Sequence, residues 1–331
     1  VSPPTGTIAR PTLGSGTATM SGTVTLANST TLRGLALSTG ASTGLTDPAS
    51  ALTSVDVDQT SVATTTGTGL ALSDIGGTVK LAALTSNGGT GANLTGSNSG
   101  ATFDFTGVAI SSGANPGLAA TGGGTIRVTG TTNTIASTTG TALNVSNTTI
   151  GASGLTFRSI SANGAVNGIV LNNTGATAGL AVTGTGAAGS GGTIENTTGD
   201  AVSLTSTRDA SLSWMTISDN LGNGIFGSSV TNFTLASSTV DNNADDDATD
   251  EAGIKFGNLL GTASITDTTV SNSLEDNARI VNSSGTLSQL TITNSTFRDP
   301  AAASPGNNGL LLQADGTASI TADITGSSFL R

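Results

Sequence analysis

Apolar and polar residues alternate along most of this chain in short runs. β-Branched residues recur at every second position in segments such as 23–26, 55–57 and 291–293. A period of two places successive side chains on opposite faces, which predicts half-buried β-strands. Gly, Asn, Ser and Asp interrupt the runs every few residues and predict turns. No segment has the periodicity of an amphipathic helix, so we expect a helix content near zero.

The last third of the chain repeats one pattern, in which a hydroxyl-bearing residue precedes an apolar anchor. The anchors are Ile217, Val240, Val270, Phe297 and Phe329, and the differences between their numbers are 23, 30, 27 and 32. Two residues after the first four anchors stand Asp219, Asn242, Asn272 and Asp299. A loose period of this size is typical of a solenoid, in which each unit buries its apolar side by stacking on the next.

The pattern predicts an all-β chain that forms a single right-handed parallel β-helix. At about 22 to 30 residues per coil, the 331 residues make about 11 to 15 coils. We expect one domain over residues 1–331, with degenerate coils over 1–140 and well-defined coils over 141–331, and we interpret the chain as a fragment of a longer one. One inward row is predicted to contain Leu143, Ile169, Val202, Ile225, Ile254, Ile280 and Leu310. The interior is also predicted to contain Phe103, Phe105, Phe157, Phe233 and Phe297.

The segments 189–204 and 221–225 carry a resemblance to a known family. Their Gly, Asn and Asp residues followed by β-branched runs resemble the repeats of right-handed parallel β-helix proteins of bacterial surfaces, whose fold is pectate-lyase-like. The resemblance covers about residues 140–331. It implies an extracellular or cell-surface location and a role like that of autotransporter passengers and adhesins. The same fold also hosts polysaccharide lyases and hydrolases, so the resemblance indicates a fold more than a function.

Composition excludes several classes of function. The chain has no Cys, His or Tyr, which removes disulfides, thiol catalysis and the commonest zinc ligands. It has 10 basic and 21 acidic residues, a net charge of −11 and a pI of about 4.1. Such a surface repels phosphate backbones, so we expect no nucleic-acid partner. No apolar run approaches the ~20 residues that span a bilayer, so we expect no membrane insertion of this segment.

The densest group of charges, residues 241–251, is a candidate calcium loop. Oxygen-bearing side chains at alternate positions resemble the opening of calcium-binding loops, and the candidate ligands are Asp241, Asn243, Asp245 and Asp247. The sixth and twelfth positions lack the Gly and Glu of that pattern. The alternative is a solvated loop between two coils. Ca²⁺ is the one cofactor that the sequence suggests.

Candidate catalytic groups are sparse, so we expect no enzyme. Asp219 and Asp299 share one predicted row, but two Asn-bearing coils separate them, which is too far for the paired carboxylates of glycoside hydrolysis. The Arg residues are expected to be isolated, and other outward carboxylates are expected in unaligned coils: Asp56, Asp58, Asp74 and Asp104. The group closest to an acid-and-base cluster is Lys255 with Asp250 and Glu251.

The candidate interaction surface consists of Trp214, Phe226, Val281 and Leu311. The repeat aligns Trp214, the only Trp, with turn residues, where it either packs on the turn or forms a platform for a sugar. The other three are expected on one outward row beside Lys255. An exposed apolar patch there would mark an interaction site, and the alternative is a patch that neighbouring loops cover. An ice-binding face is not expected, because aligned coils do not keep Thr in register.

These observations predict an extracellular structural or adhesive β-solenoid of a bacterial cell surface, a rod or filament-forming protein without catalysis. Its expected partners are other copies of itself, through end-to-end or lateral assembly, or ligands that are cell-surface molecules or glycans. The alternative is a polysaccharide-binding or polysaccharide-degrading β-helix protein.

Overall fold

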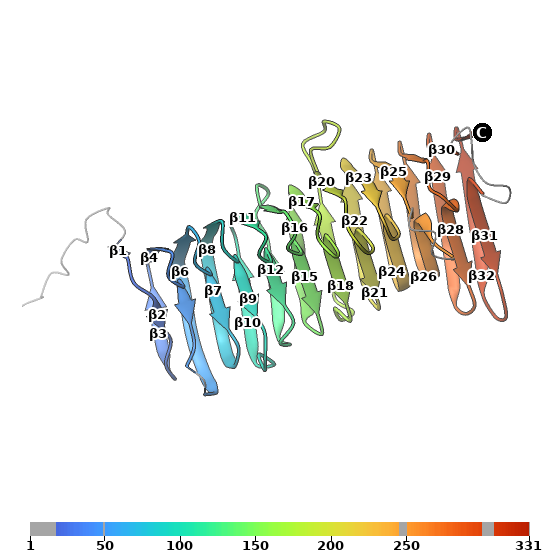
Figure 1. The fold of residues 1–331 in the computed structure, drawn as a ribbon. Helices are drawn as coiled ribbons and strands as arrows, with labels where there is room; N and C mark the ends of the chain where they lie inside the picture. Colours follow the sequence, from blue (N-terminus) through green and yellow to red (C-terminus); the bar gives the residue numbers. More distant parts are fainter. Residues whose placement is uncertain (1–17, 49, 245–249, 300–307, 331) are drawn as a thin grey trace, which may run out of the picture.

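The chain winds into an elongated stack of parallel strands (Figure 1). The computed structural model describes residues 18–48, 50–244, 250–299 and 308–330. These residues form strands and turns without any helix, and the strands of each coil pair in parallel with those of the coils before and after. The predicted parallel β-solenoid is therefore confirmed. Its right-handed winding stays a prediction, which the general preference of parallel crossovers supports.

Each coil contributes strands to three walls. Wall 1 contains β1 (Ala18–Met20), β4 (Leu35–Gly40), β11 (Val108–Gly113), β14 (Thr134–Ser137), β17 (Ser159–Asn163), β20 (Gly192–Glu195), β23 (Met215–Asn220), β25 (Thr239–Asn243), β27 (Thr269–Ser271), β30 (Thr296–Arg298) and β33 (Ser328–Leu330). Wall 2 contains β2 (Val24–Thr25), β5 (Leu45–Thr46), β7 (Leu70–Leu72), β9 (Ala92–Leu94), β12 (Leu118–Ala120), β15 (Leu143–Ser146), β18 (Ile169–Asn172), β21 (Val202–Thr205), β28 (Asp276–Asn282) and β31 (Leu310–Ala314). Wall 3 contains β3 (Thr30–Arg33), β10 (Ala101–Phe105), β13 (Thr125–Val128), β16 (Thr149–Phe157), β19 (Leu180–Val182), β22 (Arg208–Ser213), β29 (Thr286–Thr293) and β32 (Ser319–Thr325).

Four longer strands turn a corner and serve two walls each. Strands β6 (Leu52–Thr64) and β8 (Ile75–Asn87) pass from wall 3 to wall 1. Strands β24 (Ile225–Ala236) and β26 (Ala252–Thr266) pass from wall 2 to wall 3. The corners of these strands carry register shifts, which bend the chain without ending the pairing.

The inward residues of wall 2 show how the coils stack. They form twelve rungs, and therefore eleven turns from the first to the last: Val24, Leu45, Leu70, Ala92, Leu118, Leu143, Ile169, Val202, Ile225, Ile254, Ala278 and Leu310. Eleven turns lie at the lower end of the predicted range. The coils over residues 18–140, where the repeat is hard to recognise, stack in the same rows as the rest.

One member of the predicted inward row was wrong. Ala278 stands between Ile254 and Leu310, whereas Ile280 pairs with Phe256 and Leu312. The alignment error is two residues, and strand side chains alternate with a period of two. Ile280 therefore still points inward and is buried.

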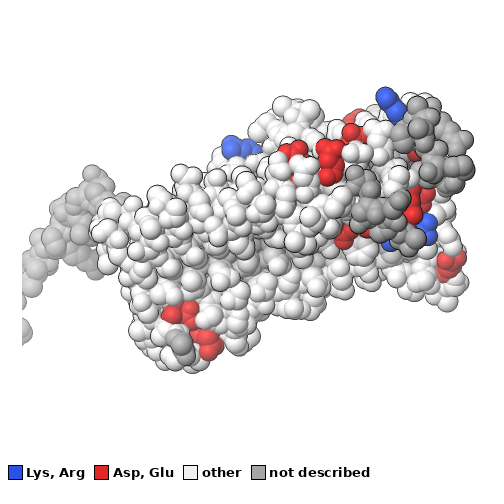
Figure 2. Space-filling view, in the orientation of Figure 1, with Lys and Arg blue, Asp and Glu red and all other residues white. Residues whose placement is uncertain are grey.

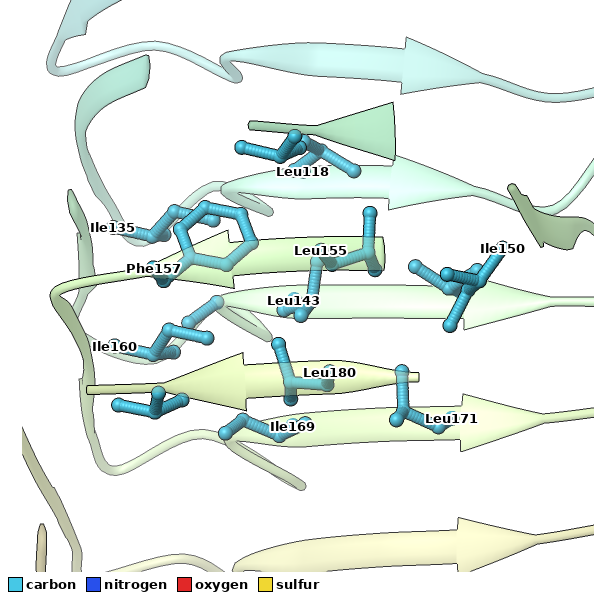
Figure 3. Close-up of a cluster of buried hydrophobic side chains, with 14 of the residues drawn as sticks. Leu118, Ile135, Leu143, Ile150, Leu155, Phe157, Ile160, Ile169, Leu171 and Leu180 are labelled. Atoms are coloured by element: carbon cyan, nitrogen blue, oxygen red, sulfur yellow. The ribbon is translucent and has the colours of Figure 1, made fainter. Parts of the chain in front are cut away.

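Apolar side chains fill the interior along the stack. Leu118, Leu143 and Ile169 of wall 2 point toward Leu155 and Phe157 of wall 3 (Figure 3). The anchors Ile217, Val240, Val270 and Phe297 form one continuous ladder, and each is fully buried. All five Phe residues predicted to lie inside are buried, and Phe256 joins them. Each such side chain contributes roughly 1.5 to 3 kcal/mol of burial free energy.

The corner before each anchor explains the hydroxyl and turn residues of the repeat. The residues three positions before the anchors have left-handed φ values of 50° to 61°: Trp214, Ser237, Asp267, Asn294 and Gly326. The next residues, Ser238, Thr268 and Ser295, are buried and form a hydroxyl ladder between coils. The backbone N–H of Ser238 donates to Thr268 Oγ1 at 3.4 Å, and that of Thr268 donates to Ser295 Oγ at 3.2 Å. The hydroxyl ladder satisfies backbone donors that the corner removes from the strand pairing.

Buried Asn side chains perform the same task at other corners. Asn220 and Asn243 are fully buried, and Asn220 Nδ2 donates to Asn243 Oδ1 at 2.6 Å. Asn98, Asn133 and Asn282 are also fully buried and bond to backbone groups of neighbouring coils. The interior is therefore apolar between corners and hydrogen-bonded at them.

Candidate functional site

The candidate calcium ligands do not share one side of the coil wall. Asp241 is partly exposed, and its Oδ1 accepts hydrogen bonds from Ser271 Oγ at 2.6 Å and Asn272 Nδ2 at 2.7 Å. Asn243 lies inside, because Asn242 between them has a left-handed φ of 52° that turns the chain at a corner and breaks the alternation of faces. The amide oxygen of Asn243 already accepts from Asn220. Asp245 and Asp247 lie outside the described residues, so calcium binding stays a prediction for them.

Trp214 packs against a turn of the preceding coil. It is partly buried and has a left-handed φ of 61°. A Cβ added to Gly184 would lie 2.7 Å from Trp214 Cβ and 2.8 Å from Cδ1, so the indole covers this glycine. The arrangement fits the turn-packing alternative, and it leaves part of the ring accessible.

The outward row of wall 2 changes character near the C-terminal end. Its rungs are small or polar over most of the stack: Thr25, Thr46, Ala71, Asn93, Ala119, Asn144, Val170 and Ser203. The next four rungs are Phe226, Lys255, Arg279 and Leu311. Large and charged side chains therefore gather on wall 2 over β24, β26, β28 and β31.

The sequence placed Val281 in this row, which is a second consequence of the two-residue alignment error. Arg279 occupies the rung between Lys255 and Leu311, and Val281 belongs to the adjacent outward row with Ser228, Gly257 and Gln313. Val281 nevertheless lies near Phe226, because both line the same hollow on wall 2. Phe226, Val281 and Leu311 are all partly buried.

Lys255 and Arg279 form a compact charge cluster with two carboxylates. Asp250 Oδ2 lies 3.3 Å from Lys255 Nζ, and Asp250 Oδ1 lies 3.0 Å from Arg279 Nη2. Arg279 Nη1 also pairs with Asp276 Oδ2 at 3.4 Å, and Lys255 Nζ donates to the backbone oxygen of Asp250. The side chain of Asp250 is 55% exposed, whereas those of Lys255 and Arg279 are 22% and 29% exposed. The cations are thus held in place, and one carboxylate between them remains open to solvent.

Asp200 adds a further carboxyl group near Lys255. Burial raises the pKa of Asp200 above its usual value of 3.8, while hydrogen bonds from Asn223 and the charge of Lys255 act in the opposite direction. The Asp200 Oδ1 atom accepts from the backbone N–H of Asn223 at 3.2 Å and from its side-chain amide at 2.7 Å. These bonds hold the carboxyl group against the turn.

A hollow of about 250 Å³ lies beside this cluster. Its lining includes the apolar side chains of Phe226 and Val281 and the charged side chains of Lys255, Asp250 and Arg279. Gly257 forms part of its lining, and among the described residues no atom lies within 4 Å of the position that a Cβ on Gly257 would take. The hollow therefore exists because Gly257 replaces a side chain in an outward row.

A second charged feature lies on wall 3, where sequence reasoning expected isolated residues. Arg33, Asp58, Lys80, Asp104 and Arg127 lie on successive coils, so the sign of the charge alternates from coil to coil. Arg33 is in register with Asp58, and Lys80 is in register with Asp104 and Arg127. Asp58 and Lys80 lie on the paired strands β6 and β8 at a register shift and line one hollow. We name these five residues the charge ladder. The expectation that Asp58 and Asp104 sit in unaligned coils was wrong. The expected isolation of the Arg residues was wrong for Arg127, Arg208 and Arg279, which form ion pairs.

The ends of the charge ladder are ion-paired within the chain. Arg33 Nη2 lies 2.7 Å from Asp56 Oδ2, and Arg127 Nη1 lies 3.6 Å from Asp104 Oδ2. The hydrogen bond to Asp56 raises the pKa of Arg33 above its usual value. A hollow of about 330 Å³ lies between Asp58, Lys80 and Asp104. Register found only in the folded chain brings these residues together, and their spacing of 22 to 25 residues was the signal available in the sequence.

The remaining surface carries few charges. On the face that Figure 2 shows, acidic side chains gather over the C-terminal coils and in one small group near the N-terminal end. Residues 18–48, 50–244, 250–299 and 308–330 contain no group of three or more acidic side chains placed to hold a metal ion. The same residues contain no helix long and apolar enough to cross a membrane.

Comparison of the chain with protein-family models, curated proteins and solved structures found no match. The resemblance to bacterial surface β-helix proteins therefore depends on the repeat pattern and on the solenoid fold.

Proposed function

We propose that the chain is an extracellular structural and adhesive rod of a bacterial cell surface. The observation that carries this proposal is the uninterrupted stacking of coils from β1 to β33 around one closed apolar interior. Side chains at the corners satisfy the backbone groups there, so the stack resists bending and local opening. A stiff spacer that presents long side walls needs these properties and needs no catalytic centre.

Three surfaces support contact with partners. The outward rows of wall 2 offer uncharged small residues over eight coils, which suit close packing and hydrogen bonding more than charge attraction. The charge ladder suits lateral contact with a second copy, since alternating signs are complementary to themselves after a shift of one coil. The last described coil exposes Ile324, Phe329 and Leu330 at 41%, 47% and 50%. Exposed apolar side chains of this kind support contact with a further coil or with a partner.

Electron microscopy of the purified chain tests the proposal directly. We expect straight rods at low concentration, and end-to-end or lateral assemblies as the concentration rises. Rods that remain single at every concentration would remove self-assembly from the proposal and leave a stalk that binds other surface molecules. Compact particles without a long axis would contradict the proposal as a whole. Binding to a panel of surface polysaccharides, measured in parallel, tests adhesion.

Polysaccharide degradation is the second candidate, and the hollow on wall 3 favours it. Asp58 and Asp104 lie on the strands on either side of Lys80 and line one hollow with it. Two inter-strand spacings are on the order of 9.5 Å, at the upper limit for an inverting carboxylate pair. A panel of neutral and acidic polysaccharides, assayed for new reducing ends, tests it. Activity that disappears in both Asp58→Asn and Asp104→Asn would establish the second candidate, and no release of reducing ends would exclude it for the panel.

A further inference from the structure

The hollow on wall 2 has the shape of a small binding site. It measures about 250 Å³, below the roughly 300 to 1,000 Å³ of pockets for drug-sized ligands. Such a volume suits one ring-sized group. Gly257 lies in an outward row between Ser228 and Val281, both of which have side chains, and its missing side chain leaves the depression. A second hollow on wall 2, of about 240 Å³, lies among Thr46, Ala71 and Asn93 and has no aromatic or cationic side chain in its lining.

The lining of the hollow combines two kinds of chemistry. Phe226 presents apolar surface in the row of Lys255 and Arg279, and Val281 presents it in the row of Gly257, two coils further on. Lys255, Arg279 and Asp250 present donors and an exposed carboxylate between them. A ligand that fits must therefore have an apolar face and a polar edge in one small ring. Binding sites of this kind combine an apolar wall with a few fixed polar groups that set the orientation.

The charge balance of the hollow favours a neutral ligand. Lys255 and Arg279 are already paired with Asp250 and Asp276, so the four charges cancel. An anionic ligand would have to displace Asp250 from both cations, and the net charge of −11 repels it at longer range. The ion pairs with Asp250 and Asp276 engage two N–H groups of the guanidinium, which has five. Its other N–H groups and the open lone pairs of Asp250 suit hydroxyl groups.

We propose that this hollow binds one ring of a neutral, hydroxyl-rich ligand, a hexose unit of a surface glycan. The C–H face of the ring would lie against Phe226, and Val281 would border the opposite end of the hollow. Its hydroxyl groups would accept from Arg279 and Lys255 and donate to Asp250. This proposal rests on the adhesive part of the proposed function, and it assigns that adhesion to a defined place on the rod.

Filling the hollow provides the test. Gly257 lies within strand β26, its φ is not left-handed, and there is open space where a side chain would stand. Gly257→Val should therefore fold normally and occupy the hollow. The matched control is Gly22→Val on the first coil, because Gly22 is exposed and, like Gly257, has open space and no left-handed φ. Phe226→Ala, which removes the aromatic surface of the hollow, is the second variant.

Saturation-transfer NMR and titration calorimetry would measure binding of the methyl glycosides of glucose, galactose and mannose, with methyl glucuronide as the anionic counterpart. We expect at least one neutral glycoside to bind with a Kd on the order of 1 mM, as suits a ring-sized ligand. We expect binding at least about tenfold weaker in Gly257→Val and Phe226→Ala, and unchanged in Gly22→Val. Melting temperatures of all variants confirm that the rod is intact.

Three results would overturn the proposal. The first is that no neutral glycoside binds. The second is that methyl glucuronide binds more tightly than its neutral counterpart. The third is that Gly257→Val and Phe226→Ala both bind the glycosides as the wild type does. If the rod still adheres to polysaccharide surfaces in the last case, the proposed adhesive function stands and only its place is wrong. If the rod adheres to none of them, the adhesive function itself fails.

Discussion

Replacing Asn98 by Ala tests whether buried corner amides hold the coils together. Asn98 is fully buried between β9 and β10. Its Oδ1 accepts from the backbone N–H of Ile75 at 3.0 Å, and its Nδ2 donates to the carbonyls of Leu72 at 3.1 Å and Thr95 at 2.9 Å. One side chain thus ties the corner of its own coil to the coil before it.

The expected loss of stability follows from these three bonds. A hydrogen bond contributes about 1 kcal/mol net, and a buried polar group left without a partner costs about 1 to 3 kcal/mol. Ala can replace none of the three bonds, and the closed corner limits the access of water to the N–H of Ile75. We therefore expect Asn98→Ala to lower the free energy of unfolding by about 3 kcal/mol.

Guanidinium unfolding followed by far-ultraviolet circular dichroism would measure this loss. The control is Asn115→Ala, an exposed corner residue whose amide donates to the carbonyls of Gly88 at 3.0 Å and Ser112 at 3.3 Å. Water can replace those bonds, so we expect a loss below about 1 kcal/mol. The slope of the transition should stay the same in both variants. Equal losses in Asn98→Ala and Asn115→Ala would refute the reasoning.

Three further predictions follow. Gly227→Ala should destabilise the fold by about 1 to 3 kcal/mol, because its Cβ would lie 2.1 Å from Phe256 Cδ1. The control Gly257→Ala should be neutral, and equal melting temperatures of the two variants would contradict this prediction. Burial raises the pKa of Asp200, so the stability linked to its protonation is present below about pH 3.8 and is lost as the pH rises through the raised value. Asp200→Asn should therefore stabilise the chain at pH 7 and give no gain below pH 3.8, and a pH series of unfolding midpoints checks it. Asn243→Ala should lower the melting temperature equally in calcium and in chelator, since the hydrogen bonds of the Asn243 side-chain amide lie inside the solenoid. A lower melting temperature in calcium alone would indicate that Asn243 is a calcium ligand.

The repeat in the last third of the chain predicted the stacking of the wall 1 strands correctly, because the residues that define it are close together in the sequence. An anchor, the hydroxyl residues before it and the polar residue after it occupy one corner and one short strand of wall 1. All the constraints on that corner lie within a few residues, so they recur in the sequence. The ladder from Ile217 to Phe329 was therefore correct at every rung.

The register of the wall 2 strands could not be predicted in the same way. The segment between an anchor and the next wall 2 strand varies in length, and the Asn-Ala-Arg-Ile run at 277–280 offers two inward residues two positions apart. Apolar periodicity cannot distinguish them, since both choices bury the same face. The pairing of Lys255 with Arg279, and so the charge cluster beside Gly257, became visible only in the register of the folded chain.

The sequence by itself determined the class of the fold, because alternation, turn residues and a loose repeat are local properties that leave a parallel solenoid as the consistent arrangement. It also determined which apolar side chains of the strands are buried, because the period of two fixes the face of each strand residue, but it did not predict the buried amides at the corners, such as Asn220 and Asn243. The tertiary structure alone decided which coils carry neighbouring charges and where a glycine opens a hollow. Those features join residues more than twenty positions apart, and their contact depends on the length of every turn between them.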